Sequence, residues 1–368
     1  MARILFYGPF NQRSRDTESL MIAFRQAGHQ VLLLTQQEGH LINDIVASRG
    51  VASYSKVFSG PRSGAWYFFR HILYFIYFCW KHRIAIVYSH LEPANFVASV
   101  SQFFVRARVH LCRHHIDEAA LYQFNSDLYY TLTYRLARSI IVVSRQARNY
   151  MIEKEGVSPG KISHINLAYD FSLYDQPDKD RAAEIKTAYN CAVLLITVAR
   201  LTRYKRPEMS VQVVRRLREH SVDAKLILLG IGEMEGELRS MINDYQLSDH
   251  VVMPGYVSNV LDYMAAADYL LHPSVLDSSC VTVKEAGLAR LPVMVCRGVG
   301  DFDDYIEHGV NGFVFDADHF VEGATSEIEM AMAGKVSYRE LMAERLYRSV
   351  MDRFSIENVM QQYSALNH

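Results

Sequence analysis

The chain has 368 residues, of which 50% are hydrophobic and 21% are charged, and its formal net charge is −1. This length favours two domains, and the composition excludes a disordered chain, a collagen-like chain and a disulfide scaffold. Five scattered cysteines without a CxxC pair indicate reduced thiols in a cytoplasmic protein, and the short apolar run at the start indicates no signal peptide.

Short runs rich in Val, Ile and Leu alternate along the chain with stretches long enough for a helix. Such runs are typical of parallel strands that are buried on both faces. We predict strands at residues 3–7, 31–35, 84–88, 109–112, 140–143 and 162–165. A second series follows at residues 193–199, 226–229, 251–253, 269–271, 293–296 and 313–315. Two series of six predict an α/β protein with two doubly wound, Rossmann-like domains rather than one sheet.

The alternation stops at residues 169–179, where the segment is polar and contains a proline. We therefore expect an N-terminal Rossmann-like domain at residues 1–170 and a C-terminal one at residues 171–352. A last helical pattern, at about 353–368, can pack back onto the first domain.

Residues 64–80, GAWYFFRHILYFIYFCW, hold both tryptophans of the chain and nine aromatic residues. The stretch is short and carries Arg70 in its middle, so it fits a membrane-spanning helix poorly. Two interpretations stay open and can hold for opposite faces. One is a core helix before the strand at 84–88, and the other is an interfacial helix that inserts aromatic side chains into lipid.

Charge is distributed unevenly along the chain. Residues 1–170 carry 19 Lys and Arg against 11 Asp and Glu, a net +8, so residues 171–368 carry a net −9. A basic first half indicates an anionic partner, such as a membrane surface or a phosphorylated acceptor, although drift between domains produces the same asymmetry. No nucleic-acid-binding motif is present, and we expect no nucleic-acid partner.

One candidate site lies in the sequence YLLHPSVLDSSCVTVKE, which reads as a strand end, a loop and a helix start. Asp277 is in the loop, and Ser278 or Ser279 is expected to cap a helix that begins near Cys280, with Glu285 about two turns inside it. A helix N-terminus can bind phosphate, and two carboxylates around such a turn suit a polyhydroxylated ligand. Alternatively, Asp277 caps the turn and Glu285 is a solvated helix residue.

A second candidate site is the turn VARLTRYK, which follows the strand at 193–199 and carries Arg200 and Lys205. Ligands of open α/β sheets bind outside the carboxyl ends of the strands. The Arg fork and the compact Lys charge both suit a diphosphate, although the same residues fit ordinary surface charges.

The adjacent pair His114 and His115 follows the strand at 109–112 and could donate to a ligand. A metal would need further ligands at suitable spacing, and the nearby sequence offers none, so we expect no metal. A structural role is the alternative for each histidine. Asp301 and Asp303 form a DxD sequence, which we interpret as the acidic first turn of a helix rather than as a metal site.

Taken in order, these stretches resemble the family 4 glycosyltransferases, which have the GT-B architecture of two Rossmann-like domains facing across a cleft. The resemblance covers most of the chain. It is carried by AGHQVLLLT, SIIVVSRQARNYM, KISHINLAYD, VARLTRYKRPE, LGIGEMEGELRSM, HVVMPGYVSNVLDYMAAADYLLHPS and GVNGFVF.

The resemblance implies roles for individual residues. Arg200 and Lys205 would hold the diphosphate of the donor, and Glu285 would bind the ribose. Asp277 stands first in the E-x7-E motif of the family and would address the hydroxyls of the donor sugar. The chain after it would touch sugar and phosphate at Ser278, Ser279, Cys280 and Val281. Tyr256 would lie near the base.

On the acceptor side, His114 matches the family histidine near the reacting sugar, and His115 is the alternative. The chain departs from the family pattern in four places. Asp277 replaces a glutamate, and the sequence SSC replaces Gly-aromatic-Gly. The linker has NLAYD at residues 166–170 where a glycine is common, and the first loop, GPFNQRSR, lacks a glycine pair. Arg13 and Arg15 of that loop could instead meet an anionic acceptor.

The resemblance implies retaining transfer of a hexose from a nucleotide-sugar, with a UDP-sugar as the first expectation and a GDP-sugar as the second. The acceptor would be a glycan or a lipid-linked intermediate in surface polysaccharide or glycoconjugate synthesis. We expect no metal, no tightly bound cofactor, and a cytoplasmic protein that can be peripheral on the inner face of a membrane. The alternatives are a sugar-nucleotide epimerase of the same architecture and a non-catalytic nucleotide-sugar- or glycan-binding protein.

Overall fold

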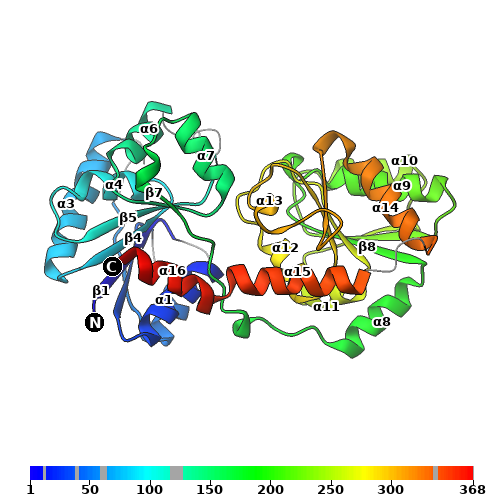
Figure 1. Cartoon of the computed structure of the whole chain (residues 1–368), viewed down its shortest axis with the longest axis horizontal. Coiled ribbons are helices and arrows are strands. Elements are labelled where there is room, and N and C mark those ends of the chain that lie inside the picture. The colour runs from blue at the N-terminus through cyan, green and yellow to red at the C-terminus, as the bar shows by residue number, and fades with distance from the viewer. Residues whose placement is uncertain (11–13, 38–40, 59–63, 117–126, 335–338, 368) are drawn as a thin grey trace. The chain divides into compact units, whose positions relative to one another are not determined.

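A computed structural model describes the chain except for residues 11–13, 38–40, 59–63, 117–126, 335–338 and 368. The described residues form two compact units, Met1–Phe171 with Phe354–His368, and Ser172–Arg353. Each unit is a parallel sheet with helices on both faces (Figure 1). The prediction of two Rossmann-like sheets is confirmed.

The first unit contains seven parallel strands in the order β3-β2-β1-β4-β5-β6-β7. The strands are β1 (Arg3–Gly8), β2 (Gln30–Thr35), β3 (Ala52–Ser55), β4 (Ile86–His90), β5 (Arg108–Arg113), β6 (Ile140–Val142) and β7 (Ile162–His164). The order reverses between β1 and β4, which makes this point the switch point where open α/β sheets bind ligands.

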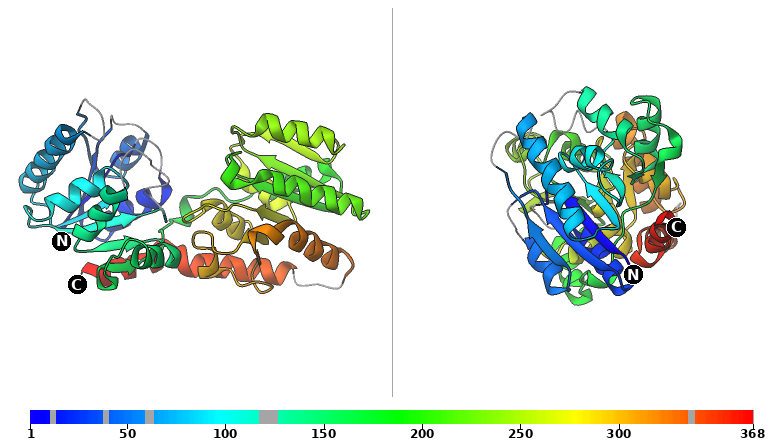
Figure 2. Two further views of the ribbon diagram at one scale, coloured as in Figure 1. Left: turned by 90° about the horizontal axis from the view of Figure 1, so that it is seen from above. Right: turned by 90° about the vertical axis from the view of Figure 1, so that its left-hand side faces the viewer.

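Helices cover both faces of this sheet. They are α1 (Arg15–Gln26), α2 (Leu41–Ser48), α3 (Ala65–Lys81), α4 (Ala94–Ser101), α6 (Asp127–Leu136), α7 (Arg145–Glu153) and α16 (Ile356–Asn367). One core lies under α3, α4, α6 and α7, and the other lies under α1, α2 and α16. Figure 2 shows α16, in red, alongside the first unit.

The second unit contains six parallel strands in the order β10-β9-β8-β11-β12-β13, with its switch point between β8 and β11. The strands are β8 (Val193–Val198), β9 (Ala224–Leu229), β10 (Val251–Gly255), β11 (Tyr269–His272), β12 (Val293–Cys296) and β13 (Phe313–Phe315). Figure 1 places α9 and α14 on one side of this sheet and α8, α11 and α12 on the other. The helices are α8 (Lys179–Tyr189), α9 (Pro207–Glu219), α10 (Glu235–Asp244), α11 (Val260–Ala266), α12 (Val281–Leu288), α13 (Phe302–Tyr305), α14 (Phe320–Met332) and α15 (Arg339–Phe354).

All twelve predicted strands are present, and one further strand, β3, was not predicted. Its sequence, ASYS, contains no apolar run, and three of its four residues are exposed at the edge of the sheet. Hydrophobic runs identify strands that are buried on both faces, so an exposed edge strand leaves no such signal.

The end of the chain is joined to the first unit by backbone hydrogen bonds. The Tyr169 N–H donates to the Phe354 carbonyl at 2.8 Å, and the Ile356 N–H donates to the Tyr169 carbonyl at 2.9 Å. Tyr363 of α16 then packs edge-on against Phe24, with ring centroids 6.0 Å apart. These contacts make α16 part of the hydrophobic core that lies under α1 and α2.

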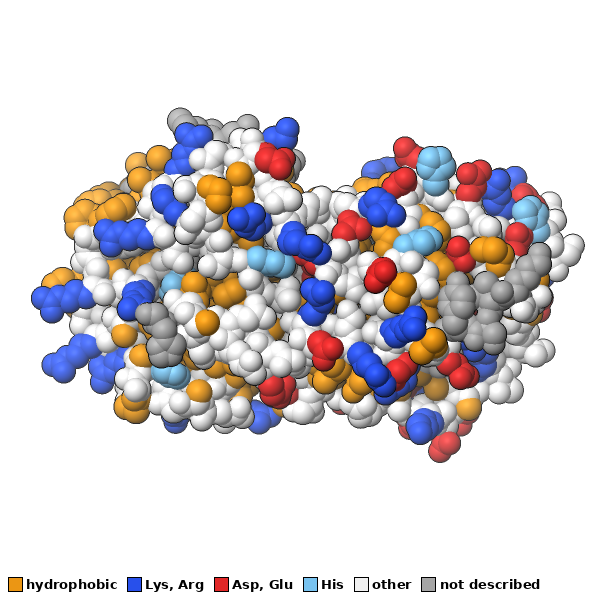
Figure 3. Space-filling model, in the orientation of Figure 1, with side chains coloured by type: hydrophobic (Ala, Val, Ile, Leu, Met, Phe, Trp, Pro, Cys, Tyr) orange, Lys and Arg blue, Asp and Glu red, His pale blue; other side chains and the backbone are white. Residues whose placement is uncertain are grey.

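Helix α3 contains the aromatic stretch and has two different faces. The buried face packs into the core with Tyr67, Phe68, His71, Phe75, Phe78 and Cys79. The opposite face leaves large apolar side chains exposed at Trp66, Phe69, Leu73, Tyr77 and Trp80. Figure 3 shows hydrophobic and basic side chains together at the edge of the first unit where α3 lies in Figure 1. Within the described residues, no helix is long and apolar enough to cross a membrane.

Candidate functional site

The loops at the switch point of the second sheet pack closely on one another. After β9, a Cβ atom at Gly230 would lie 1.9 Å from the Ala199 carbonyl oxygen, and one at Gly232 would lie 2.4 Å from the Leu201 carbonyl oxygen. Gly230 also has a φ of +134°, a backbone conformation that residues with a side chain rarely adopt. Glycine at these two positions lets the chain after β9 lie directly against the chain after β8.

The turn after β8 is also fixed to the loop after β11. The Val275 N–H donates to the Tyr204 carbonyl at 2.9 Å, and the buried Ser274 hydroxyl donates to the same oxygen at 3.2 Å. These bonds hold Lys205, the next residue, beside the loop that carries Asp277.

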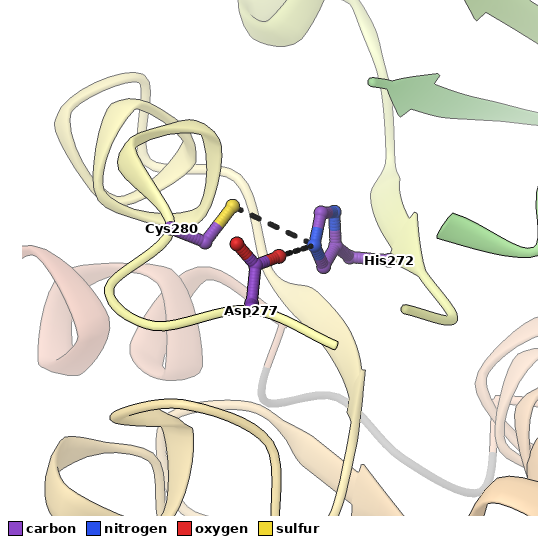
Figure 4. A group of neighbouring side chains, drawn as sticks. All are labelled: His272, Asp277 and Cys280. Atoms are coloured by element: carbon purple, nitrogen blue, oxygen red, sulfur yellow. Dashed lines mark hydrogen bonds and ion pairs between the residues drawn. The ribbon is translucent and has the colours of Figure 1, made fainter. Parts of the chain in front are cut away.

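Lys205, Asp277, His272 and Cys280 form a polar cluster at this edge of the sheet. The Lys205 ammonium donates to Asp277 Oδ2 at 2.5 Å, and His272 Nε2 lies 3.0 Å from the same oxygen. The Cys280 sulfur lies 3.5 Å from His272 Nε2, so the thiol and the carboxylate both face the same ring nitrogen (Figure 4). The His272 side chain is 2% exposed, while those of Lys205 and Asp277 are 13% and 15% exposed. The cluster is therefore protected from bulk water but reachable at one end.

The electrostatics of the cluster favour the charged forms. Burial acts to raise the pKa of Asp277, but His272 and Lys205 outweigh it and hold that pKa well below its usual range. Burial acts to lower the pKa of His272, but the Cys280 sulfur and the hydrogen bond to Asp277 raise it to about 9. Burial also opposes the charge on Lys205, and Cys280 and Asp277 raise its pKa. At neutral pH the site holds a persistent ammonium next to a carboxylate.

The contact between His272 and Asp277 predicts that the free energy of unfolding depends on pH. Because the folded-state pKa of His272, about 9, lies above the unfolded value near 6.5, its stabilisation is complete below pH ~6.5 and is lost as the pH rises through about 9. We expect the free energy of unfolding to be lower at pH ~9.5 than at pH ~6.5 by on the order of 1–3 kcal/mol, measured by urea denaturation.

His272→Gln should reduce this difference, whereas the control His319→Gln, at an exposed position, should keep it. The same pH dependence in His272→Gln as in the unchanged protein would contradict the assignment.

A second buried ion pair, between Lys284 and Asp301, lies next to the cluster. Its contacts show that the predicted serine cap of α12 is wrong. Lys284 Nζ donates to Asp301 Oδ2 at 2.8 Å, with both side chains almost fully buried, and the Ser279 hydroxyl donates to the same oxygen at 2.6 Å. Neither serine caps α12, because its N-cap is Cys280, which makes no side-chain cap hydrogen bond. Ser279 is instead drawn to the buried Asp301 carboxylate, and the Ser278 carbonyl lies 2.7 Å from where a Gly300 Cβ would stand.

The DxD sequence does not present a paired carboxylate site. Asp301 bonds with Lys284 and Ser279, while Asp303 Oδ2 accepts from the Gly298 N–H at 2.6 Å. The two carboxylates serve separate structural contacts, in agreement with the interpretation as an acidic first turn.

Arg200 joins the cluster through Tyr204. The exposed Arg200 guanidinium donates to the Tyr204 hydroxyl at 2.6 Å. Its Cζ lies 6.0 Å from the centre of the Tyr204 ring, and Lys205 Nζ lies 5.8 Å from the same centre. The two predicted cations therefore border one aromatic ring.

The remaining predicted donor residues lie farther along these elements. Tyr256 follows β10 and is 79% exposed. Glu285 is half-buried and is the fifth residue of α12, so it lies just over one turn into the helix rather than two. Val281, the first residue of α12, is exposed. Direct contacts thus join Lys205, Asp277 and Cys280 to His272 at the centre of the cluster.

The first unit has its own polar group at the carboxyl ends of β4 and β5. His90 Nδ1 and His114 Nε2 lie 2.9 Å apart and form a hydrogen bond. Burial, with His114 alongside, holds the pKa of His90 well below its usual range. Burial also lowers the pKa of His114, and Asp16 opposes that shift. Two neutral imidazoles therefore lie beside the switch point of the first sheet.

The loop after β5, which carries His114 and His115, is fixed by the buried Arg113. Arg113 makes two hydrogen bonds with the Glu155 carboxylate, at 2.9 and 2.8 Å. It also donates to the His115 carbonyl at 2.9 Å and to the Ile116 carbonyl. Arg15 is half-buried at the start of α1, and Arg13 lies outside the described residues.

Several residues of these two groups were given no role from the sequence, although Arg113, Tyr204 and His272 lie in the candidate stretches. They are His90, Arg113, Glu155, Tyr204, His272 and Lys284. One signal was available for the histidines, because His90 and His272 are each the last residue of a strand next to a switch point.

Three side chains of the cluster could hold a metal ion. Ligand atoms of His272, Asp277 and Cys280 lie within 4.8 Å of one another, and imidazole, carboxylate and thiolate are all zinc ligands. Lys205, however, already neutralises the carboxylate at 2.5 Å. A cation would have to displace this ammonium, so the absence of a resident metal stays a prediction.

Two sequence families match the chain and together extend over most of it. Glycosyl transferases group 1 matches residues 178–348, and Glycosyltransferase Family 4 matches residues 14–173. The chain belongs to the family 4 type of glycosyltransferase. The cluster around Lys205 and Asp277 thus lies in the region that matches group 1.

Curated relatives are about one quarter identical to this chain over the aligned residues. The N-acetyl-alpha-D-glucosaminyl L-malate synthase of Bacillus anthracis is 27% identical over 215 residues, 58% of this chain and 55% of the relative. A Campylobacter jejuni enzyme is 25% identical over 166 residues, 45% of this chain and 43% of the relative. Its name describes a 4-alpha-N-acetylgalactosaminyltransferase acting on a diphospho-undecaprenol-linked sugar. The chain therefore matches about half of each relative's length.

Solved structures share the fold over the whole glycosyltransferase chain. HepE of Anabaena in complex with UDP has a TM-score of 0.82 and 17% identity and covers 99% of both chains. Its complex with UDP-glucose has a TM-score of 0.80 and 18% identity, covering 100% of this chain and 99% of that one. The GT-B fold is thereby established.

Proposed function

We propose that this glycosyltransferase moves a hexose from a UDP-sugar to a glycan or lipid-linked acceptor, with retention of the anomeric configuration. The observation that carries the proposal is the charged cluster of Lys205 and Asp277 at the switch point of the second sheet. The likeness to a fold that binds UDP and UDP-glucose in HepE favours UDP over GDP.

The two cations of the cluster would bind the donor diphosphate. The Lys205 ammonium has three donors, so it can keep its bond to Asp277 and still donate to a phosphate oxygen. Arg200 offers a planar fork on the other side of Tyr204. As the bond between sugar and phosphate breaks, negative charge grows on the leaving UDP, and these fixed cations stabilise it.

The carboxylate of Asp277 would accept hydrogen bonds from the hydroxyls of the donor sugar. Glu285 would accept from the ribose, and Tyr256 would lie near the base. The sugar and the phosphates of the donor would contact the chain at Ser278, Ser279, Cys280 and Val281. These assignments rest on the family resemblance and on the order of the elements around the cluster.

The acceptor would bind on the first unit. The neutral His114 would lie near the reacting sugar, with His115 as the alternative. Arg15 and Arg13 would meet an anionic acceptor. A diphospho-lipid acceptor, as in the name of the Campylobacter relative, has this charge and favours a cytoplasmic, membrane-peripheral role in surface polysaccharide or glycoconjugate synthesis.

The test is a screen of nucleotide-sugars for slow hydrolysis, which needs no knowledge of the acceptor. We expect release of UDP and of the free sugar from one UDP-sugar, with the α-anomer as the first product in proton NMR spectra. A changed UDP-sugar without release of UDP would indicate the epimerase, and tight binding without any turnover would indicate a non-catalytic binding protein.

We further expect turnover to be independent of divalent cations, because Lys205 and Arg200 already supply the positive charge that a metal would bring. Activity after dialysis against EDTA should equal that before it. Loss of activity that zinc restores would instead assign a metal to His272, Asp277 and Cys280.

A further inference from the structure

The exposed face of α3 forms a continuous apolar stripe. Its residues, Trp66, Phe69, Leu73, Tyr77 and Trp80, are between 49% and 65% exposed. Their spacing of three and four residues places all five on one side of the helix. The opposite side of α3 packs into the core, so the stripe is the side of the helix that faces away from it.

The stripe continues onto the segment after α4. Phe103 and Phe104 are 51% and 60% exposed, and the Trp80 indole N–H donates to the Phe104 carbonyl at 3.0 Å. We call the five stripe residues together with Phe103 and Phe104 the α3 patch. Contiguous exposed aromatic groups of this kind mark an interaction site, whereas single exposed apolar residues do not.

Basic side chains lie directly over the rings of the patch. Arg138 Cζ is 5.1 Å from the centre of the Phe103 ring, and Lys81 Nζ is 5.5 Å from the centre of the Tyr77 ring. Arg106 Cζ is 5.8 Å from the Trp80 ring. Among the described residues, no Asp or Glu forms an ion pair with Lys81, Arg106 or Arg138. These charges are therefore available to an outside anion.

A pocket of about 410 Å³ opens at the end of the stripe. Trp80, Ile84 and Val105 form apolar parts of its wall, and Arg83 and Arg106 also line it. Two guanidinium groups beside an indole suit a phosphate that is attached to an apolar body, which is the chemistry of a phospholipid headgroup.

We propose that the α3 patch docks onto an anionic lipid bilayer. Tryptophan and tyrosine prefer the level of the lipid headgroups, leucine and phenylalanine enter the acyl region, and the surrounding cations attract anionic lipids. The net charge of +8 on residues 1–170 complements such a surface. The inference is independent of the proposed transfer reaction, since binding to vesicles requires neither donor nor acceptor.

Tryptophan fluorescence tests the docking directly, because the only two tryptophans of the chain, Trp66 and Trp80, both belong to the patch. The full chain is mixed with phosphatidylcholine vesicles that contain either no phosphatidylglycerol or about one third of it. We expect a blue shift and co-sedimentation with the anionic vesicles only, and at least tenfold weaker binding at ~0.5 M NaCl. No blue shift with anionic vesicles would overturn the proposal.

Two double variants show whether vesicle binding depends on the α3 patch itself or only on the overall charge of the protein. Phe69→Gln with Leu73→Gln should weaken binding to anionic vesicles at least tenfold and leave the melting temperature unchanged, because both side chains are exposed. The matched control, Met332→Gln with Leu341→Gln in the second unit, alters two similarly exposed residues and should bind as the unchanged protein does. Equal binding of both variants would contradict the patch.

A self-association surface is the competing explanation and gives a different result. In that case light scattering would find a dimer that Phe69→Gln with Leu73→Gln converts to a monomer, without any change in vesicle binding. This outcome would overturn membrane docking, whereas a monomer in both proteins together with reduced vesicle binding supports it.

Discussion

Replacing Lys205 by alanine is expected to lower the turnover of UDP-sugar by about 10²–10³-fold, the usual effect of removing one preorganised donor from a developing negative charge. The ammonium is held at 2.5 Å from Asp277 and beside Tyr204, so it is already positioned before any charge develops. Release of UDP in single-turnover experiments measures the effect.

Two further variants give this experiment its controls. Lys205→Arg keeps a cation and should recover part of the lost turnover, although its planar fork differs in shape from the ammonium. Arg215→Ala removes an exposed cation that pairs with Glu219 on α9 and should leave turnover unchanged. An unaltered rate in Lys205→Ala would remove Lys205 from the proposed mechanism.

The second large effect is expected at Asp277. Asp277→Asn should lower kcat/KM for the donor roughly 10- to 100-fold, because a carboxylate that accepts from sugar hydroxyls becomes a neutral amide. UDP affinity should fall much less, since the cations that bind the diphosphate remain. The charge on Lys205 and His272 loses its nearest counterion, so the melting temperature is measured alongside.

The affinities for UDP and for the UDP-sugar together show whether Asp277 acts on the sugar or on the nucleotide. Titration calorimetry with UDP and with the UDP-sugar gives the affinity for the nucleotide and the added affinity for the sugar. Loss of only the sugar contribution supports hydroxyl recognition by Asp277. Equal losses for both ligands would show that this carboxylate acts on the nucleotide, through the position of Lys205.

Buried parallel strands were predictable from the sequence, whereas edge structure was not. The runs that became β8 and β12 are apolar at nearly every position, because both faces of those strands are covered. The strand β3 has no such run, since most of its residues face water. Its pairing with β2 depends on backbone hydrogen bonds, which any residue except proline can donate whatever its side chain.

Part of the candidate site followed from its position after buried strands. Position indicated two separate candidate stretches, and only the family resemblance implied that Lys205 and Asp277 bind one donor; the structure joins the two side chains directly. His272 was missed because a strand-final histidine resembles any buried polar residue until its partners are known. Its link to Cys280 and Asp277 arises only when the loop after β11 folds back.

The predicted serine caps failed for a comparable reason. Local sequence favours Ser278 or Ser279 at the start of α12, but the Asp301 carboxylate, brought from a distant loop, accepts the Ser279 hydroxyl instead. The energy of satisfying a buried carboxylate exceeds that of one helix cap. Sequence spacing carries no information about this competition between residues far apart in the chain.

The most direct test of the central claim is a calorimetric titration of UDP into the unchanged protein and into Arg200→Ala with Lys205→Ala. The account predicts saturable binding of one UDP per chain that weakens at least tenfold in the variant. Because Asp277 loses its ammonium partner in the variant, the melting temperature without UDP is measured alongside, and the titration is carried out below the lower of the two values. UDP binding of equal strength in both proteins, or none in the unchanged protein, would contradict it.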